Sequence, residues 1–264
     1  MGGKRNTAIE FALGIFLYFM HRDEAIVTDC IENLYNIISQ EKVDFVAAGI
    51  NQIDENENSL KITNYPNITR KGKLCMAQYF YEEKNDIWVT TWNKLYNLSF
   101  LREFHIHFLE HVYHEDIVMH AMLALNTRSF TLTSQTPNLY NCKREDSITN
   151  MEQGYTLKHL NDLTIVFSEI RRLIQADNNL SKHLQKEINL YYLFEIYHRY
   201  LPAMYSNIKK VDLIKGLARL SQNCLPPILE TRLTFKSIKR FLFLKLPFNI
   251  QYLIKSHKYK KSRV

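Results

Sequence analysis

The sequence lacks several features that mark whole classes of protein. Its four cysteines, Cys30, Cys75, Cys142 and Cys224, lie far apart and form no Cys-x-x-Cys pair, which argues against a disulfide framework and a zinc ribbon. No stretch approaches the ~20 apolar residues that a membrane-spanning helix needs, and no signal-peptide pattern opens the sequence. Internal repeats and low-complexity segments are also missing. These absences favour a folded protein of a reducing, cytoplasmic compartment.

Acidic residues are missing after Glu230, whereas ten of the 34 lysines and arginines lie beyond it. The net charge of +7 therefore comes from this tail, because residues 1–230 carry 24 basic and 27 acidic residues. In the tail, basic residues alternate with Leu, Ile and Phe, a pattern typical of a helix in a membrane interface. Each Lys or Arg there gains about 1 kcal/mol from anionic lipid. Nucleic-acid binding or a solvated charged end would be the alternatives; we predict an anionic membrane surface, at the inner membrane, and no nucleic acid.

The remaining pattern predicts a mixed α/β part followed by helices. Hydrophobic residues make up 46% and charged residues 23% of the 264 residues, as in ordinary globular proteins that bury a sizeable core. The spacing predicts a buried strand at 15–20, a helix over 27–42 with Thr28 as N-cap, a hairpin of 43–50 with 60–63, a short helix over 72–83 and a strand over 129–133. Further helices are expected over 155–175, 180–200 and 211–220. We expect an α/β domain over 1–150, a helical region over 151–230 and a basic amphipathic tail over 231–264.

One stretch, residues 88–116, is not easily explained by packing alone. It contains the run Trp92-Asn93-Lys94-Leu95-Tyr96, then Phe100-Leu101, and then His114-Glu115-Asp116 before an expected helix over 117–126. Together with the Gly2-Gly3 to Arg5-Asn6 segment and Pro137-Asn138-Leu139-Tyr140, these motifs resemble, in order, the second half of family 2 glycosyltransferases. The resemblance covers residues 2 to about 150. It implies a partial GT-A-like mixed sheet flanked by helices, followed by a helical C-terminal region.

The resemblance also implies roles for individual residues. Sugar transfer to a hydroxyl needs a carboxylate that accepts the hydroxyl proton, and Asp116 is implied as this base with Glu115 beside it. Trp92 would give the sugar an apolar platform, and Lys94 of the same motif would contact donor or acceptor. The alternative is that Glu115 and Asp116 only favour the start of a helix, where acidic side chains offset the macrodipole.

The family's metal motif is altered in this sequence. Where family members carry an Asp-x-Asp motif at the end of a strand, this chain has His21-Arg22-Asp23-Glu24. Asp23 and Glu24, with His21 in place of the first acid, are the expected ligands of a divalent Mn or Mg ion that holds the diphosphate. Arg22, and further along the chain Lys143 and Arg144, could contact the diphosphate through charge-assisted hydrogen bonds. The alternative is that His21 and Arg22 are solvated loop residues at a decayed metal site and that Lys143 and Arg144 are simply exposed.

Histidines offer a second possible metal site. Half of the ten lie between positions 105 and 120: His105, His107, His111, His114 and His120. The zinc-protease pattern His-Glu-x-x-His fails, because a valine occupies position 118 where the second histidine should be. A transition-metal site is possible if His111, His114 and His120 face one cavity. We expect instead that most of these histidines are surface or partly buried helix residues.

The strands that carry the nucleotide pocket in the family precede the Gly-Gly segment, and this sequence has no counterpart for them. Their absence predicts an exposed sheet edge, with self-association or a second chain that supplies the missing strands. The expected function is inverting transfer of a sugar from a nucleotide-diphosphate donor to a saccharide or lipid-linked acceptor, in cell-surface polysaccharide synthesis. The alternative is a truncated, non-catalytic relative that acts as a membrane-associated binding partner.

Overall fold

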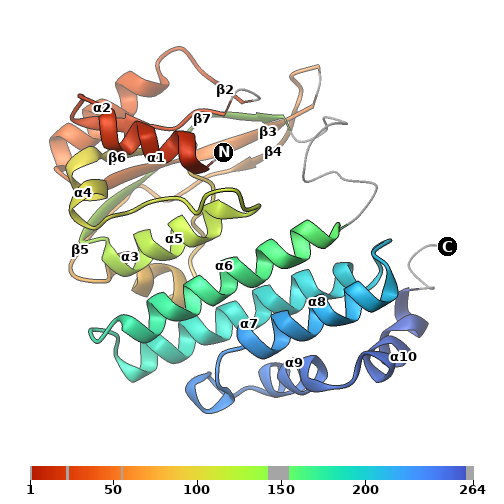
Figure 1. Ribbon diagram of the computed structural model, residues 1–264. Helices are drawn as coiled ribbons and strands as arrows, with labels where there is room; N and C mark the ends of the chain where they lie inside the picture. The colour runs from red at the N-terminus through yellow and green to blue at the C-terminus, as the bar shows by residue number, and fades with distance from the viewer. Residues whose placement is uncertain (1, 22–23, 55, 142–154, 260–264) are drawn as a thin grey trace. The chain divides into compact units, whose positions relative to one another are not determined.

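The computed structural model divides into two compact units, Met1–Met151 and Glu152–Val264 (Figure 1). It describes residues 2–21, 24–54, 56–141 and 155–259, without the side chains of 256–259. Within the second unit, residues 235–245 and 248–259 form helices. The domain boundaries expected from the sequence stay a prediction.

A mixed sheet forms the centre of the first unit, as predicted. Its path is β1-β6-β3-β7-β2, with β4 paired to β3 and β5 paired to β7. The strands are β1 (Phe16–Tyr18), β2 (Ala25–Ile26), β3 (Phe45–Ile53), β4 (Ser59–Thr63), β5 (Ile68–Lys71), β6 (Lys94–Asn97) and β7 (Ser129–Asn141). Among these pairings only β3 with β7 is parallel. The predicted hairpin of β3 and β4 is confirmed.

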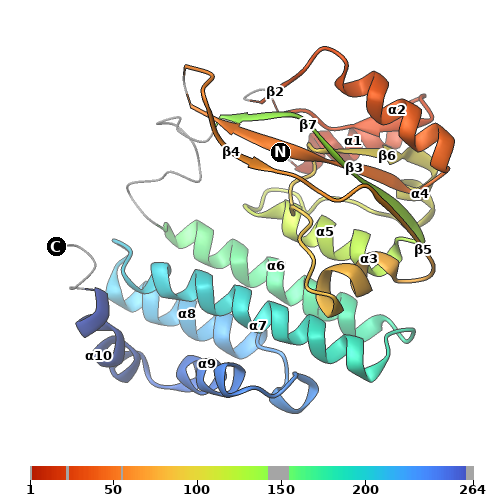
Figure 2. The same ribbon diagram turned by 180° about the vertical axis from the view of Figure 1, so that it is seen from behind.

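Apolar residues of β3 and β7 build the core of this sheet. Phe45, Ala47 and Ile50 of β3 are fully buried, and the Phe45 ring stacks on Phe130 of β7 at 5.5 Å between centroids. A strand that is apolar on both faces requires cover on both sides. Figure 2 shows α2 on one side of the sheet and α3 with α5 on the other. The helices of this unit are α1 (Gly2–Phe11), α2 (Cys30–Glu41), α3 (Cys75–Ala77) with the π-helix η1 (Gln78–Glu82), α4 (Leu98–Glu103) and α5 (Glu115–Asn126).

Two local predictions in this unit were wrong. Helix α2 begins at Cys30 after Asp29 rather than after Thr28, and it buries Cys30, Leu34 and Ile38 while leaving Tyr35 52% exposed. The segment at 15–20 is not a buried strand, because β1 pairs only with β6 at the edge of the sheet. Its residues are half-buried, since an edge strand has a neighbour on one side only.

The second unit is helical. It contains α6 (Leu157–Ala176), α7 (Lys182–Met204), α8 (Lys210–Asn223), the 3-10 turn η3 (Ile228–Glu230), α9 (Phe235–Lys245) and α10 (Phe248–Tyr259). The three predicted helices are confirmed, and α7 extends past its predicted end to include Pro202. Helices α6 and α8 approach closely at Gly216, where an added Cβ would lie 2.5 Å from Leu160 Cδ2. In the part of the chain that the structure describes, no helix has both the length and the hydropathy to cross a bilayer.

Candidate functional site

Arg5 of α1 joins two segments that are far apart in the sequence. Its Nη1 atom donates to Glu115 Oε1 at 2.9 Å, at the first residue of α5, and its Nη2 atom contacts His21 Nε2. The guanidinium also lies 4.9 Å from the centre of the Phe108 ring. The Arg5 and Glu115 side chains are each 13% exposed, so this ion pair is largely shielded from water. Arg5 therefore fixes the carboxylate of Glu115 beside Asp116 and brings His21 to the same place.

The segment before Arg5 is locked onto residues 108–110. An added Cβ at Gly2 would lie 2.2 Å from the carbonyl oxygen of Leu109, so only glycine allows this approach. The Asn6 side chain donates to the Phe108 carbonyl at 2.9 Å and accepts from the Phe108 backbone N–H at 2.8 Å. This two-way clamp holds α1 against the chain that leads into α5. The Gly-Gly-x-Arg-Asn pattern in the sequence thus has a direct structural cause.

Arg5 restricts what His21 can do. A guanidinium only donates hydrogen bonds, so His21 Nε2 must be the acceptor and the proton of the neutral ring lies on Nδ1. In this arrangement the Nε2 lone pair is used by Arg5 rather than by a metal ion. Of the predicted metal ligands, His21 therefore lies near Glu115 and Asp116, and its Nε2 atom accepts a hydrogen bond from Arg5.

The other residues of the predicted metal and phosphate site are placed as follows. Glu24 is half-buried, and its negative charge helps to raise the pKa of Tyr18, after burial and the neighbouring Cys30. The Tyr18 hydroxyl donates to Asn138 Oδ1 at 2.5 Å. The remaining predicted contacts lie outside the described residues: Arg22, Asp23, Lys143 and Arg144. The ligand set of Asp23, Glu24 and His21 stays a prediction.

Asp116 lies in the first turn of α5, near the buried Lys94 of β6. Both acidic residues of that turn face the positive end of the helix dipole, directly after His114, whose φ is +65°. Lys94 is fully buried and donates to the Trp88 carbonyl at 2.7 Å, the Thr90 carbonyl at 2.5 Å and Asn93 Oδ1 at 2.7 Å. Burial lowers the pKa of Lys94 to about 7, and the negative charge of Asp116 acts in the opposite direction. Near neutral pH the Lys94 side chain is therefore protonated in only part of the molecules.

His120 follows Asp116 by one helical turn and is 2% exposed. Burial, and to a smaller extent the positive charge of Lys94, lower its pKa to about 3. Neither ring nitrogen has a hydrogen-bond partner in the described residues, and the ring meets Phe80 edge-on at 4.7 Å. The buried Lys94 and His120 therefore form one electrostatic column with the half-buried Asp116 of the first turn of α5.

The predicted sugar platform, Trp92, is 5% exposed and packs in an aromatic group. Its ring lies 5.6 Å from that of Tyr140, inclined by 35°, and Tyr140 also meets Trp88 edge-on at 6.2 Å. Trp88 is half-buried and so offers more surface than Trp92. The platform role of Trp92 stays a prediction, and Trp88 is the more accessible indole of the pair.

The histidines of residues 105–120 do not form a metal site. The described residues contain no group of three or more His, Cys, Asp or Glu side chains placed to hold an ion. His105, His107 and His111 are exposed, and His114 is half-buried. The expected exposure of most of these histidines is confirmed, but their expected placement in helices is wrong, because α4 ends at Glu103 and α5 begins at Glu115, so that only His120 lies in a helix.

The sequence analysis did not place Arg5 and His120 in the cluster that they form with Lys94, Glu115 and Asp116. Arg5 carried a signal, because it lies in the Gly-Gly-x-Arg-Asn segment that the resemblance includes. His120 carried none, since a histidine on the apolar side of a helix has the same pattern whether or not it is partnered. Its position below Asp116 becomes visible only when β6 and α5 are packed together.

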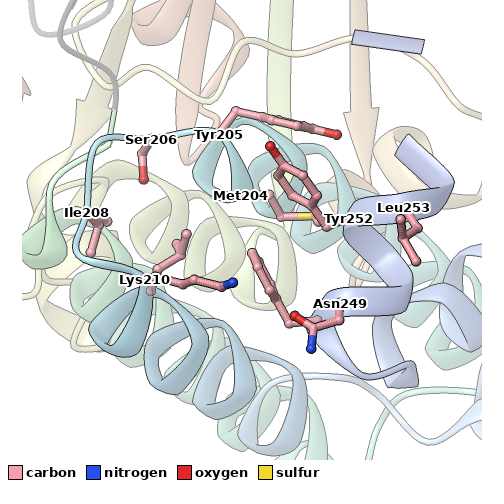
Figure 3. Close-up of a pocket in the computed structure, with 10 residues that line it drawn as sticks. Met204, Tyr205, Ser206, Ile208, Lys210, Asn249, Tyr252 and Leu253 are labelled. Atoms are coloured by element: carbon pink, nitrogen blue, oxygen red, sulfur yellow. The ribbon is translucent and has the colours of Figure 1, made fainter. Parts of the chain in front are cut away.

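A pocket of about 590 Å³ lies in the second unit and is separate from this cluster (Figure 3). It is formed by the end of α7, the start of α8 and α10. Tyr205, Phe248 and Tyr252 line it, and the Tyr252 ring lies 5.9 Å from Tyr205 and 6.0 Å from Phe248. None of the predicted site residues lines this pocket.

Comparison with known proteins gives a structural likeness only. No protein-family model matches the sequence, and no curated protein sequence matches it. S. aureus TarS 1–349 in complex with UDP-GlcNAc matches with a TM-score of 0.69 and 17% identity, over 93% of this chain and 70% of that chain. The UDP complex gives 0.66 and 15% identity, over 92% and 69%. TarS itself gives 0.62 and 15% identity, over 92% of this chain and 42% of TarS.

The likeness settles the fold class. TarS is a glycosyltransferase, and the match extends over nearly all of this chain. The mixed sheet flanked by helices, with a helical C-terminal region, is an α/β fold of the GT-A-like type, as the sequence motifs predicted.

Proposed function

We propose that this protein is an inverting glycosyltransferase of the family 2 type, which moves a sugar from a nucleotide-diphosphate donor to a saccharide or lipid-linked acceptor in cell-surface polysaccharide synthesis. Structural neighbours that bind UDP-GlcNAc and UDP support a nucleotide-sugar donor. The observation that carries the proposal is the Arg5–Glu115 ion pair, which fixes the Glu115-Asp116 turn above the buried Lys94. Perturbed titratable groups cluster at functional sites more often than elsewhere.

In this proposal Asp116 is the base that accepts the acceptor hydroxyl proton. A base must lie within hydrogen-bond reach of that proton, and Asp116 is half-buried rather than buried. Glu115 is held in place by Arg5 and so shapes the site without moving. Trp92 or Trp88 would contact the sugar. Lys94, which the resemblance implied as a contact of donor or acceptor, is fully buried and bonded to Trp88, Thr90 and Asn93, so in this proposal it tunes the charge around Asp116 instead.

A divalent Mn or Mg ion would be held by Asp23 and Glu24 in this proposal, and it would neutralise the leaving diphosphate. His21 fits this role less well, because its Nε2 atom is taken by Arg5. Arg22, Lys143 and Arg144 would add positive charge toward the phosphates.

The test is transfer from UDP-GlcNAc, followed as UDP release, with Mn²⁺ or Mg²⁺ present. Asp116→Asn should lower turnover by about 10²-fold or more, while UDP-GlcNAc binding and urea unfolding stay unchanged. Glu32→Gln, on the exposed side of α2, is the matched carboxylate control and should keep full activity. Full transfer by Asp116→Asn would remove Asp116 from the role of base.

A second candidate is a non-catalytic relative that acts as a membrane-associated binding partner. The engagement of His21 by Arg5 favours it, because the first position of the metal motif then lacks a free Nε2 ligand. Calorimetric titration with UDP-GlcNAc and with UDP, each with and without Mn²⁺, separates the two. Saturable heat with both nucleotides supports the transferase, and no heat with either supports the binding partner.

A further inference from the structure

Helix α9 exposes an apolar stripe on its outer side. Phe235, Ile238 and Leu242 are 83%, 41% and 58% exposed, and their spacing of three and four residues places them on one face. The opposite face packs inward through Ser237 and Leu244, which are 0% and 1% exposed. The helix is thus anchored to its unit while a large apolar surface remains in water.

Lysines flank this stripe. Lys236, Lys239 and Lys245 are exposed, and the first two have no ion-pair partner among the described residues. On a helix of 3.6 residues per turn, Lys239 and Lys236 fall on one side of the stripe and Lys245 on the other. A narrow apolar face between cationic edges is the pattern of a helix that lies in a lipid interface.

Other cations of the same region have structural partners instead. Arg232 pairs with the buried Glu187 at 3.0 Å. The Arg240 guanidinium lies 3.9 Å from the centre of the Phe194 ring, and Lys255 Nζ lies 5.3 Å from that of Tyr197. These three cations hold α9 and α10 to the other helices of the second unit. Only the outer side of α9 and α10, rather than the whole tail, is therefore available to lipid.

The apolar surface continues onto α10. Ile250, Leu253 and Ile254 are 44%, 68% and 50% exposed, again at helical spacing. Leu253 also lines the pocket shown in Figure 3, so the exposed face of α10 is continuous with that mostly apolar pocket. Of the 21 large hydrophobic side chains that are exposed in the described residues, nine lie between positions 229 and 254. On α9 and α10 these side chains lie at helical spacing and so form continuous faces, unlike the scattered apolar exposure of ordinary proteins.

We propose that the outer face of α9, with the adjoining face of α10, docks on an anionic lipid membrane. Net positive charge selects anionic headgroups, and the exposed aliphatic side chains gain from insertion among acyl chains. A second copy fits less well, because an isologous contact would bring the three lysines against their own copies. Nucleic acid fits less well, because its phosphates would contact the lysines but would leave the apolar side chains of Ile238 and Leu242 exposed to water. The proposal does not depend on the transfer reaction.

The experiment is flotation of the full chain with vesicles of neutral phosphatidylcholine alone and of phosphatidylcholine with 30% phosphatidylglycerol. Binding to the anionic vesicles should be at least tenfold stronger. Lys236→Gln, Lys239→Gln and Lys245→Gln together should lower it by about 100-fold, since each lysine contributes about fivefold. The matched control carries Lys61→Gln, Lys73→Gln and Lys215→Gln, three exposed lysines outside α9. It loses the same net charge as the α9 variant and should bind anionic vesicles within twofold of wild type.

The apolar stripe is tested separately. Phe235→Ser with Leu242→Ser should weaken binding to anionic vesicles roughly tenfold or more. Leu60→Ser with Ile62→Ser, on exposed β4, is the control and should have no effect. Equal recovery with neutral and anionic vesicles would overturn the proposal. So would a dimer in light scattering that Phe235→Ser with Leu242→Ser converts to monomer, because the stripe would then serve self-association.

Discussion

The buried ammonium of Lys94 gives the sharpest test of the cluster, because it makes stability depend on pH in a defined window. In the folded chain burial lowers the pKa of Lys94 from 10.5 to about 7. Between pH 7 and 10.5 the unfolded chain therefore binds one proton more than the folded chain. Stability rises with pH there by about 1.4 kcal/mol per pH unit. The full penalty, about 5 kcal/mol, is present below pH 7 and disappears above pH 10.5.

Lys94→Met removes this titration while keeping an unbranched side chain. It also leaves three acceptors, the carbonyls of Trp88 and Thr90 and Asn93 Oδ1, without their donor, so the variant loses stability at every pH. The pH dependence is the discriminating quantity. From pH 7.5 to 9.5 wild type should gain about 2.5 kcal/mol relative to Lys94→Met. The exposed Lys73→Met should follow the wild-type curve.

Urea unfolding followed by tryptophan fluorescence is the assay, since both tryptophans of the sequence, Trp88 and Trp92, lie in the first unit. Measurements stay below pH 9.5, because burial raises the pKa of Tyr65 to about 12 and unfolded tyrosines lose their protons near 10. That effect lowers stability at high pH in both proteins and cancels in their difference. Parallel curves for wild type and Lys94→Met would refute the buried, perturbed lysine.

Three further predictions use the same assay. The folded pKa of His120, about 3, makes wild type lose free energy of unfolding as pH falls from 6.5 to 3. Between pH 6.5 and pH 5 the unfolding free energy of His120→Leu should therefore rise by about 2 kcal/mol relative to that of wild type. A constant difference between the two proteins across that range would contradict this. Gly2→Ala should cost about 1–3 kcal/mol and Gly3→Ala less, since the new Cβ meets backbone in the first case and only the Glu110 side chain in the second; equal losses would count against the close approach. Arg5→Met should cost about 2 kcal/mol through the unpaired Glu115, and Arg5→Met with Glu115→Met should recover part of it.

The sequence predicted the elements of the fold better than their exposure. Hydrophobic spacing found α6, α7 and the β3–β4 hairpin, because each depends on a local period. It misjudged β1, since whether a strand lies at the edge or in the centre depends on its neighbours and not on its own residues. It also misjudged the cap of α2, where Asp29 precedes the helix without a side-chain hydrogen bond.

The sequence predicted members of the candidate site only where they belong to motifs that occur in the same order as in the family. The resemblance singled out Glu115 and Asp116, and the structure adds Arg5 as the partner that holds Glu115. No sequence pattern could show that Lys94 is fully buried, because lysine is rarely buried. The contact of Arg5 with His21 was equally hidden, since it joins α1 to the segment after β1 across the fold.

The energetic cost of this column supports the proposed active site. A protein that needed only a stable core would place apolar side chains at positions 94 and 120. The buried amine of Lys94 reduces stability although it donates three hydrogen bonds, and His120 does so because its ring has no hydrogen-bond partner among the described residues. Lys94 of β6 and His120 of α5 both lie near Asp116, and the charge of Asp116 acts on Lys94. Packing alone gives no reason for two such groups at one place. A site that must control the charge around a catalytic carboxylate does, since a lysine that titrates near pH 7 changes the field at Asp116 with each proton it gains or loses.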